Sequence, residues 1–359
     1  MEAEILGVHF EITCENDALL DYTRSFVRVY DDGISDNSTQ CIVKILIERS
    51  KCLPALTGDK VAIHRSKHKY WTFDGIMTPD RPPKILWETK GLLVSIGSPV
   101  VITISQEITC AFAGESIFHV IRGLALYKRA SGNFIHASAV EVNQRALLFI
   151  GSVLSGKTTL FTELVLRHNA IPISNDRVLI KPDSPVTVIS WPSYASYCEG
   201  TLLGYPELAI AAEKYEDDNN LLRTQTWIHP LKPLYSPEFK RIYPMKWFTD
   251  VCGRKYIKAS FLGAIIFSRV APEIDYPKWR RIDFDDSSWG AACHLIQEQC
   301  FDNNEPSFAP WHGLSLPSNA PSVSELLTRI KKEDCKIFEL SVPVNNWAWV
   351  PDFLGDVTR

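Results

Sequence analysis

The sequence lacks the features of a membrane-spanning chain, of a secretory signal peptide and of a cysteine-based zinc site. No run reaches the eighteen or more uninterrupted apolar residues of a membrane span, and the N-terminus has no basic region followed by an apolar one. Its nine cysteines are odd in number, scattered, and never in a Cys-x-x-Cys pair. Reduced, mostly buried thiols are therefore favoured over a disulfide framework or a zinc site. We expect a cytoplasmic protein.

A large charge of one sign is also absent. Charged residues make up 22% of the chain and the formal net charge is −4, so nothing global favours binding to nucleic acid or to an anionic membrane. We expect neither partner, and any anion site must be local. With 359 residues, 45% of them hydrophobic, the chain can bury a large core. The oligomeric state stays open.

Two regions with different patterns follow one another. Residues 1–110 carry no motif with chemistry and are interpreted as an N-terminal α/β subdomain, with an expected helix at residues 18–29. Its expected strands lie at residues 5–12, 41–47, 69–73 and 92–96. Residues 111–359 would form the second domain, which begins with an amphipathic helix at residues 118–128.

The second region then changes its hydrophobic period. Residues 134–142 and 145–150 predict two strands joined by a tight turn, and this hairpin leads directly into a glycine-containing loop. Residues 159–169 predict a helix after the loop. Its apolar face would consist of Leu160, Phe161, Leu164 and Val165. Two further strands are expected at residues 170–174 and 178–180.

The loop carries the pattern G-x-x-x-x-G-K-[ST], as Gly151, Gly156, Lys157 and Thr158. Chance would produce this pattern in only about 1–2% of chains of this length. The apolar strand before it and the amphipathic helix after it are the context of a true phosphate-binding loop. A glycine-rich turn that merely starts a helix is the alternative.

Each residue type in the loop suits an anion. Glycines let successive backbone N–H groups turn inward, and the helix N-terminus adds partial positive charge. Lys157 supplies a mobile cation for the β- and γ-phosphates, and the Thr158 hydroxyl can ligate Mg²⁺. The predicted nucleotide-binding residues are Gly151, Ser152, Ser155, Gly156, Lys157, Thr158 and Thr159.

Two further elements accompany the loop: His136, fifteen residues before Gly151, and the segment Ser174-Asn175-Asp176-Arg177-Val178. With them, residues 134–182 resemble the core of the HPr kinase/phosphorylase family, in particular its smaller kinase relatives in biosynthetic gene sets. The resemblance implies an α/β P-loop kinase domain related to phosphoenolpyruvate carboxykinase. It also implies ATP, Mg²⁺ and a hydroxyl acceptor on a small molecule or peptide.

One departure from the family concerns its acidic pair. The family has Asp-Asp, the first acting as catalytic base and the second helping with the metal, whereas this sequence has Asn175-Asp176. An amide cannot accept a proton as a carboxylate does. Three interpretations stay open: Asp176 is the base, the acceptor needs little deprotonation, or the chain only binds nucleotide, as a regulatory module.

The expected acceptor side follows from the resemblance. Asp176, with Asn175 and His136, would face the acceptor, and Thr158 with Asp176 would hold Mg²⁺. Asp176 is expected near the mouth of the loop, because it follows a strand that would neighbour the loop strand. A later basic cluster could clamp the γ-phosphate or the acceptor, with Arg241 the first choice, although such clusters are more often solvated. Its members are Lys240, Arg241, Lys246, Arg254, Lys255 and Lys258.

Overall fold

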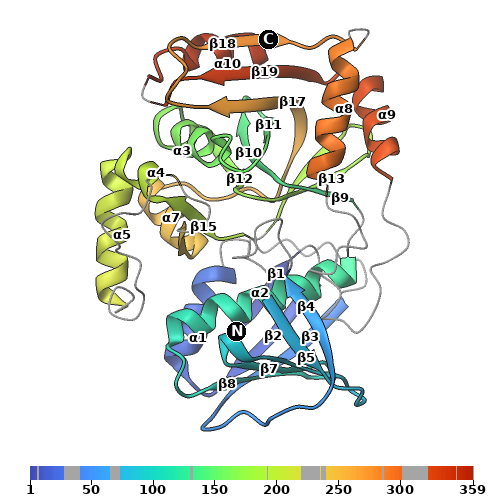
Figure 1. Ribbon diagram of the computed structural model, residues 1–359, viewed down its shortest axis with the longest axis vertical. Helices are drawn as coiled ribbons and strands as arrows, with labels where there is room; N and C mark the ends of the chain where they lie inside the picture. The colour runs from blue at the N-terminus through green and yellow to red at the C-terminus, as the bar shows by residue number, and fades with distance from the viewer. Residues whose placement is uncertain are drawn as a thin grey trace. The chain divides into compact units, whose positions relative to one another are not determined.

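The computed structural model is a mixed α/β structure whose described residues fall into two compact units (Figure 1). It describes residues 1–5, 8–27, 41–64, 73–129, 132–191, 193–219, 235, 240–284, 287–300, 322–344 and 346–358. The first unit contains the described residues up to 129, and the second those from 132 onward. No helix in these ranges is both long enough and apolar enough to cross a membrane.

The first unit is built on an eight-stranded sheet of order β1-β2-β3-β8-β7-β6-β5-β4. Its strands are β1 (Glu2–Ile5), β2 (Val8–Cys14), β3 (Cys41–Ser50), β4 (Asp59–His64), β5 (Phe73–Met77), β6 (Lys84–Trp87), β7 (Leu92–Ser95) and β8 (Val100–Ser105). Its helices are α1 (Asp17–Val27), η3 (Glu88–Lys90) and α2 (Cys110–Arg129). The strand expected at residues 5–12 is instead an antiparallel pair, β1 and β2. The strand expected at residues 69–73 lies outside the described residues except for Phe73, where β5 begins.

Helix α2 belongs to the first unit, so the two units divide after it and not before it at residue 110 as expected. Its buried Phe118 stacks on Phe26 of α1, with ring centroids 5.6 Å apart. Apolar residues of α2 such as Ile117 and Ile121 are fully buried. This helix therefore completes the core of the sheet that precedes it.

The second unit is built on a nine-stranded sheet whose main path runs β12-β10-β11-β17-β14-β13-β9, with β19 beside β17 and β18 beside β19. The strands are β9 (Asn133–Ile135), β10 (Ala137–Val142), β11 (Arg145–Ile150), β12 (Ile171–Ser174), β13 (Val178–Lys181), β14 (Thr187–Ser190), β17 (Ala259–Val270), β18 (Lys278–Arg281) and β19 (Lys336–Val342). The predicted hairpin is confirmed as β10 and β11, which pair from Ala137↔Ile150 to Val142↔Arg145. Strands β11, β17 and β19 are parallel.

Helices cover both faces of this sheet (Figure 1). The helices that lie against it are α3 (Lys157–Arg167), α8 (Ser287–Gln299), α9 (Val323–Lys332) and α10 (Val350–Thr358). A separate group consists of α4 (Glu199–Leu203), α5 (Pro206–Asp218) and α7 (Met245–Cys252), in which α5 contacts both other helices. Ile296 of α8 and Ile330 of α9 join Ile337 of β19 in one buried cluster. The next residue of β19, Phe338, points to the other face and contacts Phe353 of α10.

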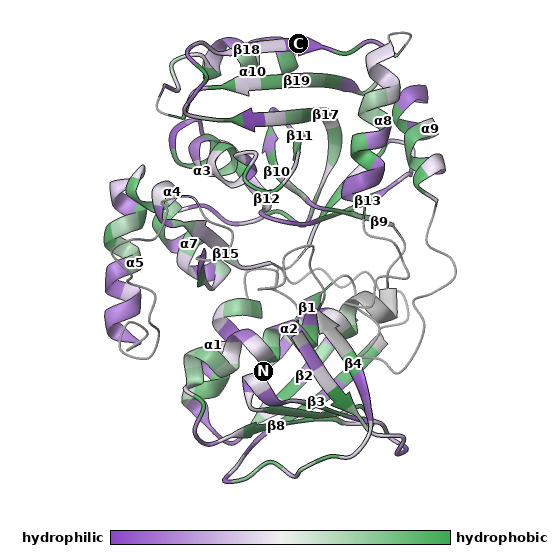
Figure 2. Ribbon diagram, in the orientation of Figure 1, coloured by the Kyte–Doolittle hydropathy of each residue, from purple (hydrophilic) through white to green (hydrophobic). Residues whose placement is uncertain are grey.

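Helix α3 is the helix predicted after the loop, although it begins at Lys157. Its four expected apolar residues, Leu160, Phe161, Leu164 and Val165, are all buried. Figure 2 shows both hydrophobic and hydrophilic residues in this helix, and its polar Thr162 and Glu163 are buried as well. Phe161 lies 5.4 Å from the Phe248 ring of α7, so aromatic packing ties these two helices together.

A separate two-stranded ribbon consists of β15 (Ala195–Cys198) and β16 (Lys240–Tyr243). The strands pair antiparallel, with Cys198 opposite Lys240 and Tyr197 opposite Arg241. Because side chains alternate along a strand, Lys240 and Arg241 point to opposite faces of the ribbon.

The cysteines are free, as expected. All eight whose side chains the structure describes lack a disulfide partner. Of these eight, only Cys198 and Cys335 are buried, so the expectation that most are buried is wrong for the described cysteines.

Candidate functional site

The glycine loop, Gly151–Thr158, joins β11 to α3 in a backbone conformation that depends on its two motif glycines. Gly156 has φ of 86°, and a Cβ there would lie 2.3 Å from the Val270 side chain. A Cβ on Gly151 would lie 2.5 Å from Ser155 Oγ. Larger residues fit neither position. No side chain caps the N-terminus of α3, so its first N–H groups are open to an anion.

Lys157 lies within this loop and is largely buried. Its ammonium donates to the Gly151 carbonyl oxygen at 2.8 Å and to that of Ser152 at 2.9 Å. Burial lowers the pKa of Lys157 to about 8, Asp176 opposes the shift, and Lys240 adds to it. A bound anion would stabilise the charged form of this lysine.

Ser155 supplies a polar group without a partner. Its side chain is 9% exposed, and its Oγ makes no hydrogen bond to any described residue. Buried hydroxyls are nearly always hydrogen-bonded. Ser155 also lines the pocket described next, and its Oγ is buried there without a partner, which suits a site where a ligand completes this hydrogen bond. Ser152 contributes its backbone, because its carbonyl accepts from Ser155 N–H as well as from Lys157.

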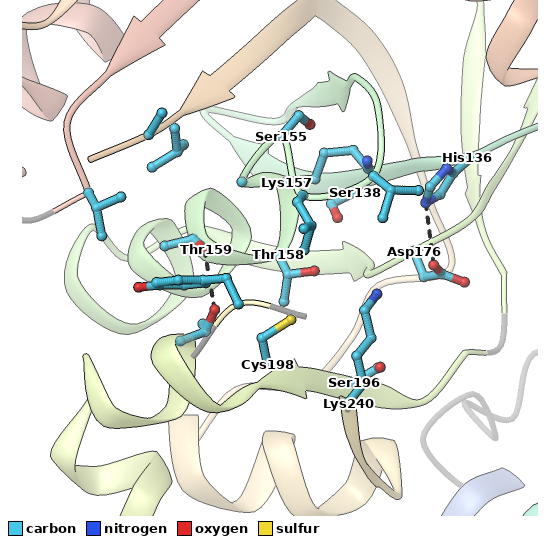
Figure 3. Close-up of a pocket in the computed structure, with 18 of the residues that line it drawn as sticks. His136, Ser138, Ser155, Lys157, Thr158, Thr159, Asp176, Ser196, Cys198 and Lys240 are labelled. Atoms are coloured by element: carbon cyan, nitrogen blue, oxygen red, sulfur yellow. Dashed lines mark hydrogen bonds and ion pairs between the residues drawn. The ribbon is translucent and has the colours of Figure 1, made fainter. Parts of the chain in front are cut away.

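A pocket of about 330 Å³ lies in front of the loop (Figure 3). Its walls come from the glycine loop, the start of α3, the β9–β10 junction, the β15–β16 ribbon and the segments after β17 and β19. The lining residues are His136, Ser138, Val153, Leu154, Ser155, Gly156, Lys157, Thr158, Thr159, Asp176, Ser196, Cys198, Thr201, Tyr235, Lys240, Val270, Ala271, Pro272 and Val344. All belong to the second unit.

His136 and Asp176 meet in this pocket, with His136 Nε2 3.6 Å from Asp176 Oδ1 (Figure 3). Backbone hydrogen bonds hold both: His136 N–H donates to the Gln299 carbonyl, and Ala137 N–H to that of Asp176. Burial, with a further contribution from the Lys157 charge, lowers the pKa of His136 to about 3. The imidazole is therefore neutral at neutral pH, while Asp176 is also contacted by Arg177, whose Nε lies 3.6 Å away.

Asp176 reaches the pocket by a different route from the one expected. The strand before it, β12, pairs with β10 and not with the loop strand β11. The expectation that β12 neighbours β11 is therefore wrong. Asp176 comes near Lys157 because the start of β10, which carries Ala137, binds the Asp176 backbone and lies opposite Ile150 at the end of β11.

Asn175 and Arg241 are not among the residues that line the pocket. Asn175 is buried, accepts a hydrogen bond from Ser138 Oγ at 3.1 Å on its Oδ1, and accepts one from Ser193 Oγ at 2.8 Å on its carbonyl. Arg241 lies on the other face of the ribbon, where it pairs with Glu199 at 2.8 Å and Glu216 at 3.3 Å.

The structure thus brings five of the expected loop residues together with His136 and Asp176, namely Ser155, Gly156, Lys157, Thr158 and Thr159. Gly151 and Ser152 do not line the pocket, and Lys240 lines it in place of its neighbour Arg241. Sequence reasoning did not select Ser138, Ser196, Cys198, Thr201, Tyr235 or the apolar residues after β17 and β19. Because successive side chains of a strand point to opposite faces, only one of Lys240 and Arg241 can face the pocket, and this could have been predicted from the sequence. The sequence contains no similar pattern that would have identified the other lining residues.

No family model matches the chain, and no curated protein matches its sequence. Among solved structures, the chain is similar to the Hpr(Ser) kinase/phosphatase from Coxiella burnetii. The match has 11% identity and a TM-score of 0.22, and covers 42% of this chain and 76% of that chain. A TM-score this low carries no argument about fold or function.

Proposed function

We propose that this chain is an ATP-dependent kinase that transfers the terminal phosphoryl group to a hydroxyl of a small molecule or peptide. One observation carries the proposal: a single pocket holds the Lys157 ammonium and the unpartnered Ser155 hydroxyl at an uncapped helix N-terminus, together with the Asp176 carboxylate. The ammonium, the Ser155 hydroxyl and the helix N-terminus suit the binding of phosphates, and the carboxylate suits a hydroxyl acceptor.

In this proposal the glycine loop is the phosphate-binding loop of an α/β P-loop kinase domain. Its backbone N–H groups and the start of α3 surround the phosphates, and Lys157 exchanges its two carbonyl partners for phosphate oxygens. The Ser155 hydroxyl would donate to an oxygen of the same ligand. Thr159, which also lines the pocket and lies 3.5 Å from Thr201 through its hydroxyl, would extend the polar wall.

Asp176 would act on the acceptor. The acceptor oxygen attacks the terminal phosphorus, the bond to the ADP oxygen breaks, and the hydroxyl proton passes to the Asp176 carboxylate. Neutral His136, 3.6 Å away, limits the orientations of that carboxylate without competing for the proton. Because phosphoryl transfer has a loose transition state, positioning and charge neutralisation contribute more than deprotonation.

The pocket also suits Mg²⁺. Thr158 and Asp176 both line it and present a hydroxyl and a carboxylate. Mg²⁺ is held by one or two carboxylates plus substrate phosphates and water, so few protein ligands are needed. Bound there, the ion would neutralise charge on the phosphate oxygens.

The rival function, a nucleotide-binding regulatory module, draws on Asn175. Because Asn175 is buried and outside the pocket lining, its amide does not take the place of a carboxylate that faces the ligand. Asp176 supplies that carboxylate. This arrangement supports the kinase.

Lys157→Ala tests the function directly. We expect the parent to bind ATP with Mg²⁺ and to form ADP, faster when hydroxyl compounds or serine-containing peptides are added. The variant should bind ATP at least about tenfold more weakly and form no ADP above background, since a charge-assisted hydrogen bond contributes about 1.5–3 kcal/mol. Calorimetry and an ADP assay provide both measurements.

Two outcomes decide against the proposal. Equal binding and turnover by parent and variant would remove the glycine loop from the active site. Binding by the parent that depends on Lys157, without ADP formation for any acceptor, would favour the regulatory module. Removal of Mg²⁺ with EDTA should lower both affinity and turnover, and no effect would exclude the metal role of Thr158 and Asp176.

A further inference from the structure

The wall of the pocket opposite the glycine loop carries a cation that the proposed mechanism does not use. Lys240 of β16 lines the pocket with Ser196 and Cys198 of β15 (Figure 3). Cys198 and Lys240 are direct partners in the ribbon, so they share its pocket-facing side. Three side chains of this ribbon, those of Ser196, Cys198 and Lys240, therefore face the same pocket as the glycine loop.

Lys240 has no hydrogen bond and no ion pair to any residue that the structure describes, in contrast to Arg241 beside it. Its side chain lines the same pocket as the Lys157 side chain. Two ammonium groups that face one cavity repel each other. An anion between them would compensate both charges at once.

The position of Lys240 in the pocket indicates which anion it would bind. The loop and the start of α3 surround the inner phosphates, whereas Lys240 lies on the ribbon side of the pocket, toward Asp176 (Figure 3). A phosphoryl group on its way from the nucleotide to a hydroxyl beside Asp176 passes between these two walls. Its negative charge is spread over the terminal oxygens, where a cation stabilises the transition state.

The opposite face of the ribbon holds Lys240 in place. Arg241 pairs with Glu199 of α4 and Glu216 of α5, and Tyr243 donates to Glu216. Tyr243 also stacks on Trp247 of α7, with ring centroids 4.2 Å apart. Because three helices anchor β16, the base of the Lys240 side chain is preorganised and only its flexible stem must move.

We infer that Lys240 binds the terminal phosphoryl group and makes the site prefer a nucleoside triphosphate over a diphosphate. The inference depends on the proposed function and deepens it, because it assigns a second phosphate-binding wall. The group that Lys240 would bind is an oxyanion. An anionic group on the acceptor could also supply this oxyanion, and the experiment distinguishes it from the terminal phosphoryl group of the nucleotide.

Lys240→Ala tests the inference through the affinities for ADP and for a non-hydrolysable ATP analogue, both with Mg²⁺ and measured by calorimetry. We expect ADP affinity to change by less than about twofold and analogue affinity to fall about tenfold, the loss of one charge-assisted contact. Turnover should fall in Lys240→Ala and be partly restored in Lys240→Arg. Lys255→Ala, which removes an exposed lysine of the same basic cluster outside the pocket lining, is the matched control and should change neither affinity.

The other outcomes overturn the inference. Equal weakening of ADP and analogue binding would place Lys240 on the inner phosphates or reveal a general charge effect, and unchanged binding of both would remove it from the phosphates. A raised KM for the acceptor with unchanged analogue affinity would assign Lys240 to an anion on the acceptor. Failure of the parent to bind nucleotide through Lys157 would instead be a failure of the proposed function.

Discussion

Asp176 holds a backbone conformation that side chains rarely adopt, with φ of 107°. Such strain persists only where surrounding structure imposes it, and it is common at functional sites. Ala137 N–H donates a hydrogen bond to the carbonyl of this residue at 3.1 Å. Asp176 lines the pocket, while the side chain of Asn175 accepts a hydrogen bond from Ser138.

Asp176→Asn is the cleanest test of the acceptor side, because asparagine tolerates positive φ and should leave the fold intact. We expect kcat to fall on the order of 10²-fold or more, as loss of a positioned base or metal ligand typically causes. Steady-state kinetics with thermal unfolding as a control would measure it. Full turnover by this variant would exclude Asp176 as base and metal ligand.

Asn175→Asp is the informative partner of that variant. A carboxylate there would be buried against Ser138, so we expect lower thermal stability and no gain in turnover. Activity that appears only in Asn175→Asp would show that the natural protein binds nucleotide without transferring phosphate.

The lowered pKa of Lys157 predicts how nucleotide affinity depends on pH. In the free protein this lysine loses its proton above about pH 8, and a bound phosphate requires the charged form. Affinity should therefore be highest below pH 8 and fall above it, by up to about tenfold per pH unit. Phosphate itself titrates near pH 6 and is fully ionised in that range. Calorimetry between pH 7 and 9.5 would show the slope in the parent, and the same slope in Lys157→Ala would contradict the assignment.

The sign of the linkage to stability is opposite to the usual effect of a paired lysine. Because the folded-state pKa of Lys157 is below the value of 10.5 expected in the unfolded chain, the unfolded state binds more protons between pH 8 and 10.5. The free energy of unfolding from this residue therefore rises with pH in that window. Below pH 8 the buried charge costs stability, and a bound nucleotide would offset this cost.

At the scale of elements, the ribbon separates two adjacent basic residues into two roles. Lys240 faces the pocket and Arg241 faces α4 and α5, where it neutralises Glu216. Burial raises the pKa of Glu216, and Tyr243 and Arg241 oppose that shift. Arg241 is therefore a structural anchor of the site, contrary to the expectation that it clamps the phosphate or the acceptor.

Arg241→Met should destabilise the second unit by about 3–5 kcal/mol, because it leaves the Glu216 carboxylate buried without its cationic partner. Urea unfolding monitored by fluorescence would measure the loss. The double variant Arg241→Met with Glu216→Gln should recover much of it, since the uncompensated charge is then absent. A loss as large in the double variant as in the single one would show that packing, and not charge, makes Arg241 necessary.

At the scale of the whole chain, the pocket lies where parallel strands end together. Strands β11, β17 and β19 run parallel, with Ile150 opposite Phe267 and Val270 opposite Val342. The segments that leave their carboxyl ends, the glycine loop, Val270–Pro272 and Val344, therefore meet at one edge of the sheet and line the pocket. Ligands commonly bind at this edge in α/β sheets.

The sequence by itself determined the local structure around the glycine loop: the β10–β11 hairpin, the loop and the buried face of α3. These depend on short-range signals, which are the turn at Asn143-Gln144, the motif glycines and the helical period. The sequence also indicated that His136 and Asp176 belong to the same site as Lys157, through its resemblance to the HPr kinase/phosphorylase family. All three line one pocket.

Only the tertiary structure decided which other residues join them. Whether Lys240 or Arg241 faces the loop depends on the register of β16 against β15, and Asn175 turns inward because Ser138 and Ser193 bind it. The same holds for the division of the chain after α2, which depends on packing against α1. Such contacts join residues far apart in the sequence, and a one-residue shift of register reverses the face of every side chain on a strand.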